Sequence, residues 1–192
     1  LAREHALLPD LLAGAEAVEV MPWGGTTTVE LVRRMPSARL TVAELSEHNV
    51  TFIRERLRQE GLGETARFTL MEEGRLPMAD ASADLVVLPQ VLEHAPEPLR
   101  LLDEAARVLR PGGRLVASVR NADSAYGARW REVESRAQVP NQGPFTPLSA
   151  GTVRGWVAER FEIESETGIG RDAVGDAEPM TGDDLMKGRL WA

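Results

Sequence analysis

The chain has 192 residues, 43% of them apolar and 27% charged, which suits one globular domain with its own hydrophobic core. It has no cysteine, which excludes disulfides and thiolate chemistry, and we expect no metal site. The net charge of −8 argues against nucleic acid as a partner, because binding phosphates needs a basic surface. The sequence contains neither a run of about 20 apolar residues, as a membrane helix needs, nor a recognisable signal peptide. We therefore expect a cytoplasmic protein, with an upstream segment missing before Leu1.

Apolar segments with strand-like and helix-like periodicity alternate along the chain. Residues 1–14 predict a short N-terminal cap helix. Strands are predicted at 17–21, 39–43, 67–71, 84–88, 114–119 and 161–166. Helices are predicted at 26–35, from an N-cap at Ser46 to Gly61 or Gly63, from Pro96 or Pro98 to 110, and at 152–160.

This alternation predicts an α/β fold with a doubly wound, mainly parallel sheet of six to seven strands and helices on both faces. We expect a single domain over 1–192, in which residues 120–148 form a lid-like insertion. Its Tyr126, Trp130 and Phe145 could line a pocket or simply order the insertion. A last strand could begin at 189–192. Ligands of such sheets bind at the carboxyl ends of the strands, near the first strand.

The segment 81–119 carries the most specific pattern in the chain. It reads ASADLVVLPQVLEHAPEPLRLLDEAARVLRPGGRLVASV, and VLEH, RVLRPGG and RLVASV follow one another in this order. The segment resembles class I methyltransferases that depend on S-adenosyl-L-methionine (SAM), and the resemblance extends over about 15–165. It implies a Rossmann-like fold, SAM as the cofactor and methyl transfer. Residues 118–121 and 145–147 resemble relatives that modify sugars or small metabolites, which implies a small-molecule or saccharide-like acceptor.

The resemblance breaks at the loop after the first strand. The family has an acid followed by three alternate glycines, whereas the chain reads Glu19-Val-Met21-Pro-Trp23-Gly-Gly25, so that only the last glycine remains. Glycine allows a left-handed backbone and a close approach to a ligand. The Trp23 ring could project into the space of the methionine part of SAM, or swing out and form a wall for a substrate.

The resemblance also implies roles for individual residues, each with a simpler alternative. Glu44 would accept the ribose hydroxyls, or be an ordinary solvated glutamate. Glu19 would contact the amino group of SAM, or only orient the loop. Glu72 would contact the adenine amino group, or be a capping or surface residue. The cofactor-binding set implied is Glu19, Met21, Trp23, Gly25, Glu44, Leu45, Glu72, Glu73 and Gln90, in which Gln90 lies at the polar edge of the site.

His94 is the candidate catalytic base, because only histidine titrates near neutral pH without large help from its surroundings. The alternative is a residue that packs at the start of the next helix. Three functions stay open: an active methyltransferase, a methyltransferase-like domain that has lost SAM and serves as a binding or scaffolding module, and other chemistry on a small metabolite. The short N-terminal cap leaves an open mouth, which a large acceptor, a second copy of the chain or a neighbouring domain could fill.

Overall fold

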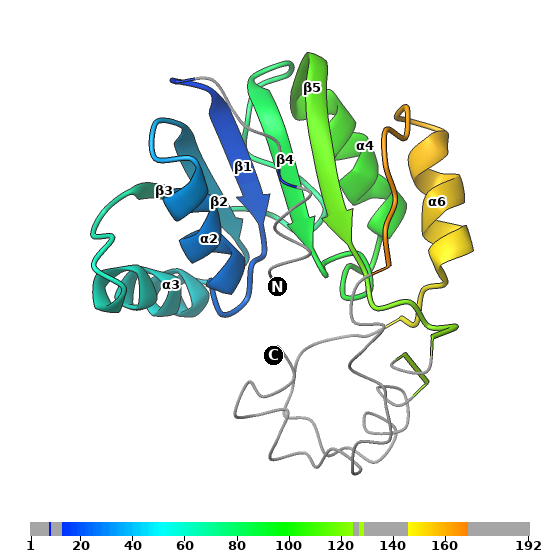
Figure 1. Ribbon diagram of the computed structural model, residues 1–192, viewed down its shortest axis with the longest axis horizontal. Coiled ribbons are helices and arrows are strands. Elements are labelled where there is room, and N and C mark those ends of the chain that lie inside the picture. The colour runs from blue at the N-terminus through cyan, green and yellow to red at the C-terminus, as the bar shows by residue number, and fades with distance from the viewer. Residues whose placement is uncertain (1–7, 9–12, 125–126, 129–145, 169–192) are drawn as a thin grey trace.

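A computed structural model of the chain describes residues 8, 13–124, 127–128 and 146–168 (Figure 1). Three sequence-based predictions therefore lie outside the described residues. They are the N-terminal cap helix apart from residues 8, 13 and 14, the last strand at 189–192, and the aromatic residues Tyr126, Trp130 and Phe145 of the insertion.

The described residues form one sheet of five parallel strands in the order β3-β2-β1-β4-β5 (Figure 1). From the central β1 the chain moves out to β3 on one side and then returns to build β4 and β5 on the other. This confirms the doubly wound α/β fold, with five strands in the described part rather than six to seven. The strands are β1 Glu16–Val20, β2 Arg39–Glu44, β3 Ala66–Leu70, β4 Ala83–Pro89 and β5 Leu109–Ser118.

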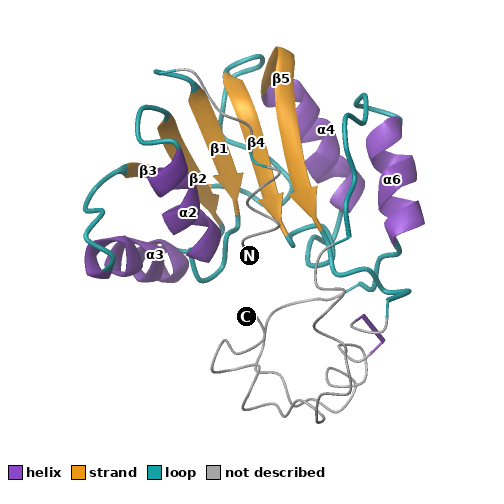
Figure 2. Cartoon of the chain, viewed as in Figure 1, coloured by secondary structure: helices purple, strands orange, loops and turns teal. Residues whose placement is uncertain are grey.

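Helices cover both faces of the sheet (Figure 2). Because successive side chains of a strand point to opposite faces, β4 feeds two separate apolar cores. Leu85 and Val87 pack with the first pair of helices, whereas Val86 and Leu88 pack with the second pair. The first pair is α2 Thr26–Arg34 and α3 Glu47–Gln59, and the second is α4 Pro98–Val108 and α6 Ala150–Ala158.

The sequence signals for the helix starts are confirmed. The Ser46 side chain accepts a hydrogen bond from the amide of Asn49 at 3.2 Å, so it caps α3 as predicted. Pro98 is the first residue of α4, where its missing N–H costs nothing. Within the described ranges, no helix is both long and apolar enough to cross a membrane.

The predicted strand at 161–166 is wrong. Residues 162–168 have no regular secondary structure and pair with no strand of the described sheet. The alternation of apolar and acidic residues does not bury one side of this segment: Phe161 packs against one core, but Ile163 is 39% exposed, and Glu164 and Glu166 pair with arginines. Glu166 forms a bidentate ion pair with Arg154 of α6, with distances of 2.6 and 2.7 Å. The alternation therefore reflects attachment to α6 rather than a strand.

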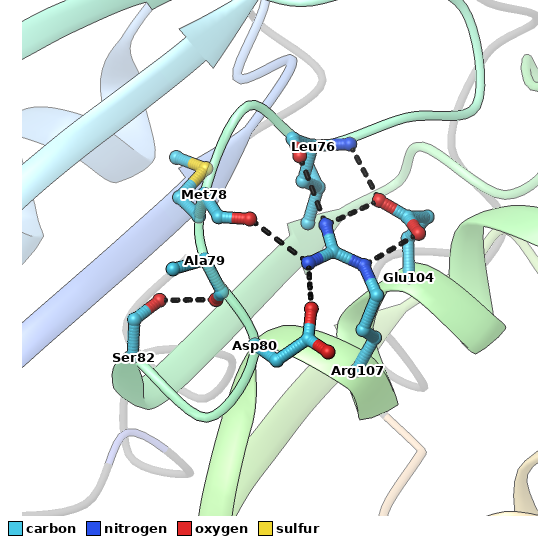
Figure 3. Close-up of polar contacts among 7 residues, drawn as sticks. All are labelled: Leu76, Met78, Ala79, Asp80, Ser82, Glu104 and Arg107. Carbon is cyan, nitrogen blue, oxygen red and sulfur yellow. Dashed lines mark hydrogen bonds and ion pairs between the residues drawn. The ribbon is translucent and has the colours of Figure 1, made fainter.

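The loop that leads into β4 is held by one arginine of α4. Arg107 donates to both carboxylate oxygens of Glu104, to the carbonyls of Leu76 and Met78, and to Asp80 at 2.6 Å (Figure 3). Glu104 in turn accepts from the Leu76 amide at 2.9 Å. These contacts fix the path of residues 76–80 against α4 and so position the start of β4.

Candidate functional site

The loops that follow β1 and β4 lie at the switch point of the sheet. These two strands are neighbours, and the chain leaves them in opposite directions, which is where doubly wound sheets bind ligands. The loop after β1 contains Met21, Trp23 and Gly25, and the loop after β4 contains Gln90 and His94. The candidate site is therefore built at this edge, as the sequence predicts.

The loop after β1 keeps a backbone that suits glycine although two of the three positions are not glycine. The φ angles of Met21, Trp23 and Gly25 are 49°, 53° and 68°, all in the left-handed region. Such a conformation costs a residue with a side chain on the order of 1–2 kcal/mol. The loop thus has the backbone conformation implied by the resemblance, with a thioether and an indole added to it.

Gly25 is required by packing between two helices. A methyl group at this position would lie 2.9 Å from Cγ2 of Ile53 on α3, closer than real contacts allow. Arg56, one turn further along α3, donates to the Gly24 carbonyl and to the Thr26 hydroxyl. The glycine and the arginine together fix the end of this loop on α3.

Trp23 and His94 join the two loops of the switch point. Their ring centroids lie 4.9 Å apart at an interplanar angle of 64°, an edge-on contact. Such aromatic pairs contribute about 0.5–1.5 kcal/mol. The indole therefore points across from the β1 loop to the β4 loop instead of swinging outwards.

Glu19 is a fully buried acid at the carboxyl end of β1. Its Oε2 accepts a hydrogen bond from the Thr28 hydroxyl at 2.6 Å, while its Oε1 is buried without a partner among the described residues. Burial raises the pKa of Glu19 to about 8, the Thr28 bond opposes the rise, and the nearby Glu44 adds to it. One oxygen of this buried carboxyl group therefore lacks a hydrogen-bond partner in the described part of the chain.

Glu44 has the same character at the end of β2. Its side chain is 1% exposed, and its Oε2 accepts from the Leu45 amide at 3.2 Å and from the Asn49 amide group at 3.0 Å. Its Oε1 is buried and has no partner in the described part of the chain. Burial raises the pKa of Glu44, against the hydrogen bonds from Asn49, Leu45 and the Trp23 backbone. The simpler alternative, an ordinary solvated glutamate, is therefore wrong, because this carboxylate is enclosed.

His94 is buried and linked to an arginine that follows β5. Its Nε2 lies 3.0 Å from Nη1 of Arg120. A guanidinium has only donors, so Nε2 holds the lone pair and the proton of a neutral ring is on Nδ1. Arg120 also contacts Oε1 of the buried Glu93, through its backbone amide at 3.1 Å and its side chain at 3.4 Å.

The other predicted site residues lie at the same edge but are more exposed. Gln90 is half-buried after β4 with a φ angle of 53°. Its backbone N–H donates to the Ser118 carbonyl at 3.0 Å. Leu45 is 42% exposed after β2. Glu72 and Glu73 are exposed in the turn after β3, beside the end of β2. The structure thus buries Glu19, Glu44 and His94 at this edge and leaves Leu45, Glu72, Glu73 and Gln90 more exposed.

Sequence reasoning missed three residues that support these groups, Thr28, Asn49 and Arg120. Thr28 and Asn49 lie in the first turns of the helices that follow Glu19 and Glu44, so the expected strand-to-helix order already placed them nearby. The contact between Arg120 and His94 joins loops that are 26 residues apart. Only the order of strands β4 and β5 reveals it, and nothing local in the sequence signals it.

Comparisons with known proteins agree with this arrangement. Residues 22–117 match the family model described as a methyltransferase domain. The chain is 35% identical over 106 residues to methyltransferase GfsG of Streptomyces halstedii, over 55% of this chain and 38% of the relative. It is 30% identical over 156 residues to the ubiquinone/menaquinone biosynthesis C-methyltransferase UbiE of Hahella chejuensis, over 80% of this chain and 62% of the relative. It therefore spans less than two thirds of either relative.

The fold is also found in a solved SAM-dependent methyltransferase from Aquifex aeolicus, with a TM-score of 0.60 and 19% identity over 78% of this chain and 73% of that one. At this identity the likeness concerns the fold alone. The fold and the switch-point loops define a class I methyltransferase-like domain. With half of its residues matched by the family model, the chain belongs to the methyltransferase domain family, whose cofactor is SAM.

The residues at the site fit this cofactor in two respects. The unpartnered Oε1 of Glu44 needs a donor, which a ribose hydroxyl is, and the unpartnered Oε1 of Glu19 needs a donor or a cation. The loop after β1 also has a left-handed backbone at the three positions where the resemblance implies glycine. The Trp23 ring lies against His94 across the switch point. Cofactor binding therefore requires this ring to leave its contact with His94.

Proposed function

We propose that the chain is a SAM-dependent methyltransferase acting on a small-molecule or saccharide-like acceptor. The observation that carries the proposal is the enclosed Glu44 carboxylate at the end of β2, with one oxygen fixed by Leu45 and Asn49 and the other unpartnered. When bound, SAM supplies a methyl group on a positively charged sulfur. The chain contributes mainly by orienting the two reactants and excluding water.

The proposal gives each site residue a binding role that agrees with its place at this edge of the sheet. Glu44 holds the ribose through Oε1, and Leu45 covers the adenosine beside it. Glu72 and Glu73 lie at the rim beside β2, where they face the adenine. Gln90 forms the edge after β4, and Glu19 serves the positively charged methionine end. The backbone of Met21, Trp23 and Gly25 contacts the cofactor directly.

His94 is proposed to accept the acceptor's proton at Nε2, the nitrogen that holds the lone pair. In the structure this lone pair faces Arg120 at 3.0 Å, so the imidazole must turn away from the guanidinium before it can act. Methyl transfer to an acidic oxygen would need no base, and His94 would then only support Trp23.

The acceptor class is supported by charge and by the relatives. A net charge of −8 disfavours nucleic acid, and UbiE is named for methylation in quinone biosynthesis. We also propose a cytoplasmic location and a partner at the open side of the site, either a second copy of the chain or a neighbouring domain.

Titration calorimetry with SAM and with its demethylated product S-adenosylhomocysteine tests the proposal. We expect micromolar binding of both. Glu44→Ala should weaken it about 10- to 100-fold, because a hydrogen bond to a charged group contributes about 1.5–3 kcal/mol. Glu55→Ala is the control, since Glu55 lies on α3 and pairs with Arg58 at 2.7 Å. Absence of binding to the unaltered protein would overturn the proposal.

One observation favours a second function, that of a binding module without cofactor. The Trp23 ring packs on His94 at the switch point instead of leaving it open. The double variant Met21→Gly with Trp23→Gly separates the two. If only the double variant binds SAM, the indole blocks the site and the module is the better description. If the unaltered protein and the double variant both bind SAM, the ring moves aside and the methyltransferase is the better description.

A further inference from the structure

Two buried carboxyl groups lie at the ends of neighbouring strands beneath the β1 loop. Glu19 and Glu44 are 0% and 1% exposed, and each has a buried Oε1 without a partner among the residues that the structure describes. Two carboxylates in such a place repel each other and are poorly solvated, so both cannot easily be ionised without a cation.

The surroundings of Glu19 contain few groups that could neutralise it. From α2, Thr28 donates a neutral hydrogen bond at 2.6 Å, and from β2, Glu44 adds negative charge. Arg56 of α3 is directed to the Gly24 carbonyl and the Thr26 hydroxyl. His94, after β4, meets the Trp23 ring and Arg120.

Burial places the pKa of Glu19 at about 8, mainly through lost solvation and further through Glu44. Below that pH the free protein therefore holds a proton on Glu19. A cation beside the group favours the ionised form and lowers its pKa.

We propose that Glu19 releases a proton when the cofactor binds, so that cofactor affinity is coupled to pH through this one buried acid. This rests on the proposed function, because SAM and S-adenosylhomocysteine both carry an ammonium group. The O–H bond of the Glu19 carboxyl breaks, the proton passes to the solvent, and the carboxylate pairs with the ligand's cation. No electrons are exchanged.

Calorimetry in buffers with different ionisation enthalpies counts this proton directly. S-adenosylhomocysteine is titrated at pH 7 into the protein in phosphate and in Tris. We expect about one proton released per ligand at pH 7, with affinity rising up to about tenfold per pH unit below pH 8. Equal enthalpies in both buffers at pH 7 would overturn the inference and leave the proposed function intact. Absence of binding at every pH would overturn both.

Variants assign the proton to Glu19. Glu19→Gln removes the acid and keeps its shape, so proton release should vanish and the affinity should lose its pH dependence. Thr28→Val removes the hydrogen bond that opposes the raised pKa, so the midpoint should move to higher pH. Thr27→Val is the matched control on the same helix and should leave the midpoint in place.

A measurement on the free, unaltered protein covers the case in which Glu19→Gln does not fold. Carbon NMR of glutamate carboxyl groups should show one resonance that titrates near pH 8, and this resonance should lose its midpoint in that range when S-adenosylhomocysteine is added. If every carboxyl titrates below pH 6, the inference is wrong.

Discussion

His94 illustrates how one contact can fix the chemistry of a side chain. Because Arg120 faces Nε2 at 3.0 Å, the neutral ring should carry its proton on Nδ1. Nitrogen NMR of the imidazole rings should show this single tautomer for His94, identified by its loss in His94→Gln. His48 is exposed on α3 and should show the mixture of an unrestrained ring. A proton found on Nε2 of His94 would contradict the geometry.

Glu19 should make the stability of the free protein depend on pH. In the unfolded chain the acid ionises near 4.5, whereas in the folded protein it keeps its proton up to about 8. The folded state therefore binds the extra proton between these values, and stability falls as pH rises through this window, by at most about 1.4 kcal/mol per unit. Urea unfolding at pH 5 and pH 8 measures the loss.

Glu19→Gln should flatten this dependence, and Glu55→Gln, at an exposed carboxylate, should not. A free energy of unfolding that rises from pH 5 to pH 8 in the unaltered protein, or the same fall in Glu19→Gln, would show that another group is responsible.

At the scale of elements, the junction between α4 and the loop before β4 depends on Arg107. Its planar group binds two carbonyls and two carboxylates at once, which an ammonium cannot reproduce (Figure 3). Arg107→Lys should lower the free energy of unfolding by about 1–3 kcal/mol. Arg100→Lys, at an exposed pair with Glu97 on the same helix, should change it little. Equal effects would mean that the network adds no stability.

The elements themselves were largely readable from the sequence. Periodicity located the five strands and the four helices, because each buries one face against a neighbour, and the cap at Ser46 and the proline at 98 marked two helix starts. The strand predicted at 161–166 failed because alternation in the sequence does not by itself bury one side of a segment, and residues 162–166 are all exposed. Whether such a segment joins a sheet depends on a neighbour with free hydrogen-bonding groups, and here Arg154 of α6 binds Glu166 instead.

At the scale of the whole molecule, the two cores share one sheet and should melt together. Leu85 and Leu88 are both 0% exposed on β4 but point to opposite cores. Leu85→Ala and Leu88→Ala should each cost about 2–5 kcal/mol and lower a single transition. Far-ultraviolet circular dichroism and tryptophan fluorescence should give coincident curves. Two separate transitions would argue against the single domain that we predict for 1–192.

The candidate site was predictable in place but only partly in detail. The acids at the ends of β1 and β2 followed from the resemblance, and their burial is the new information. The direction of the Trp23 ring was open in the sequence, because a rotamer depends on what lies opposite. That neighbour is His94, 71 positions further along the chain, which the strand order brings to the same edge.

The central claim is that the left-handed β1 loop, with its indole, still admits SAM beside Glu44. A crystal structure of the protein soaked with S-adenosylhomocysteine tests it most directly. We predict a ribose hydroxyl on Oε1 of Glu44 and a Trp23 ring that has left its contact with His94. A ring that stays against His94, with no ligand density at the end of β2 under saturating conditions, would contradict the account.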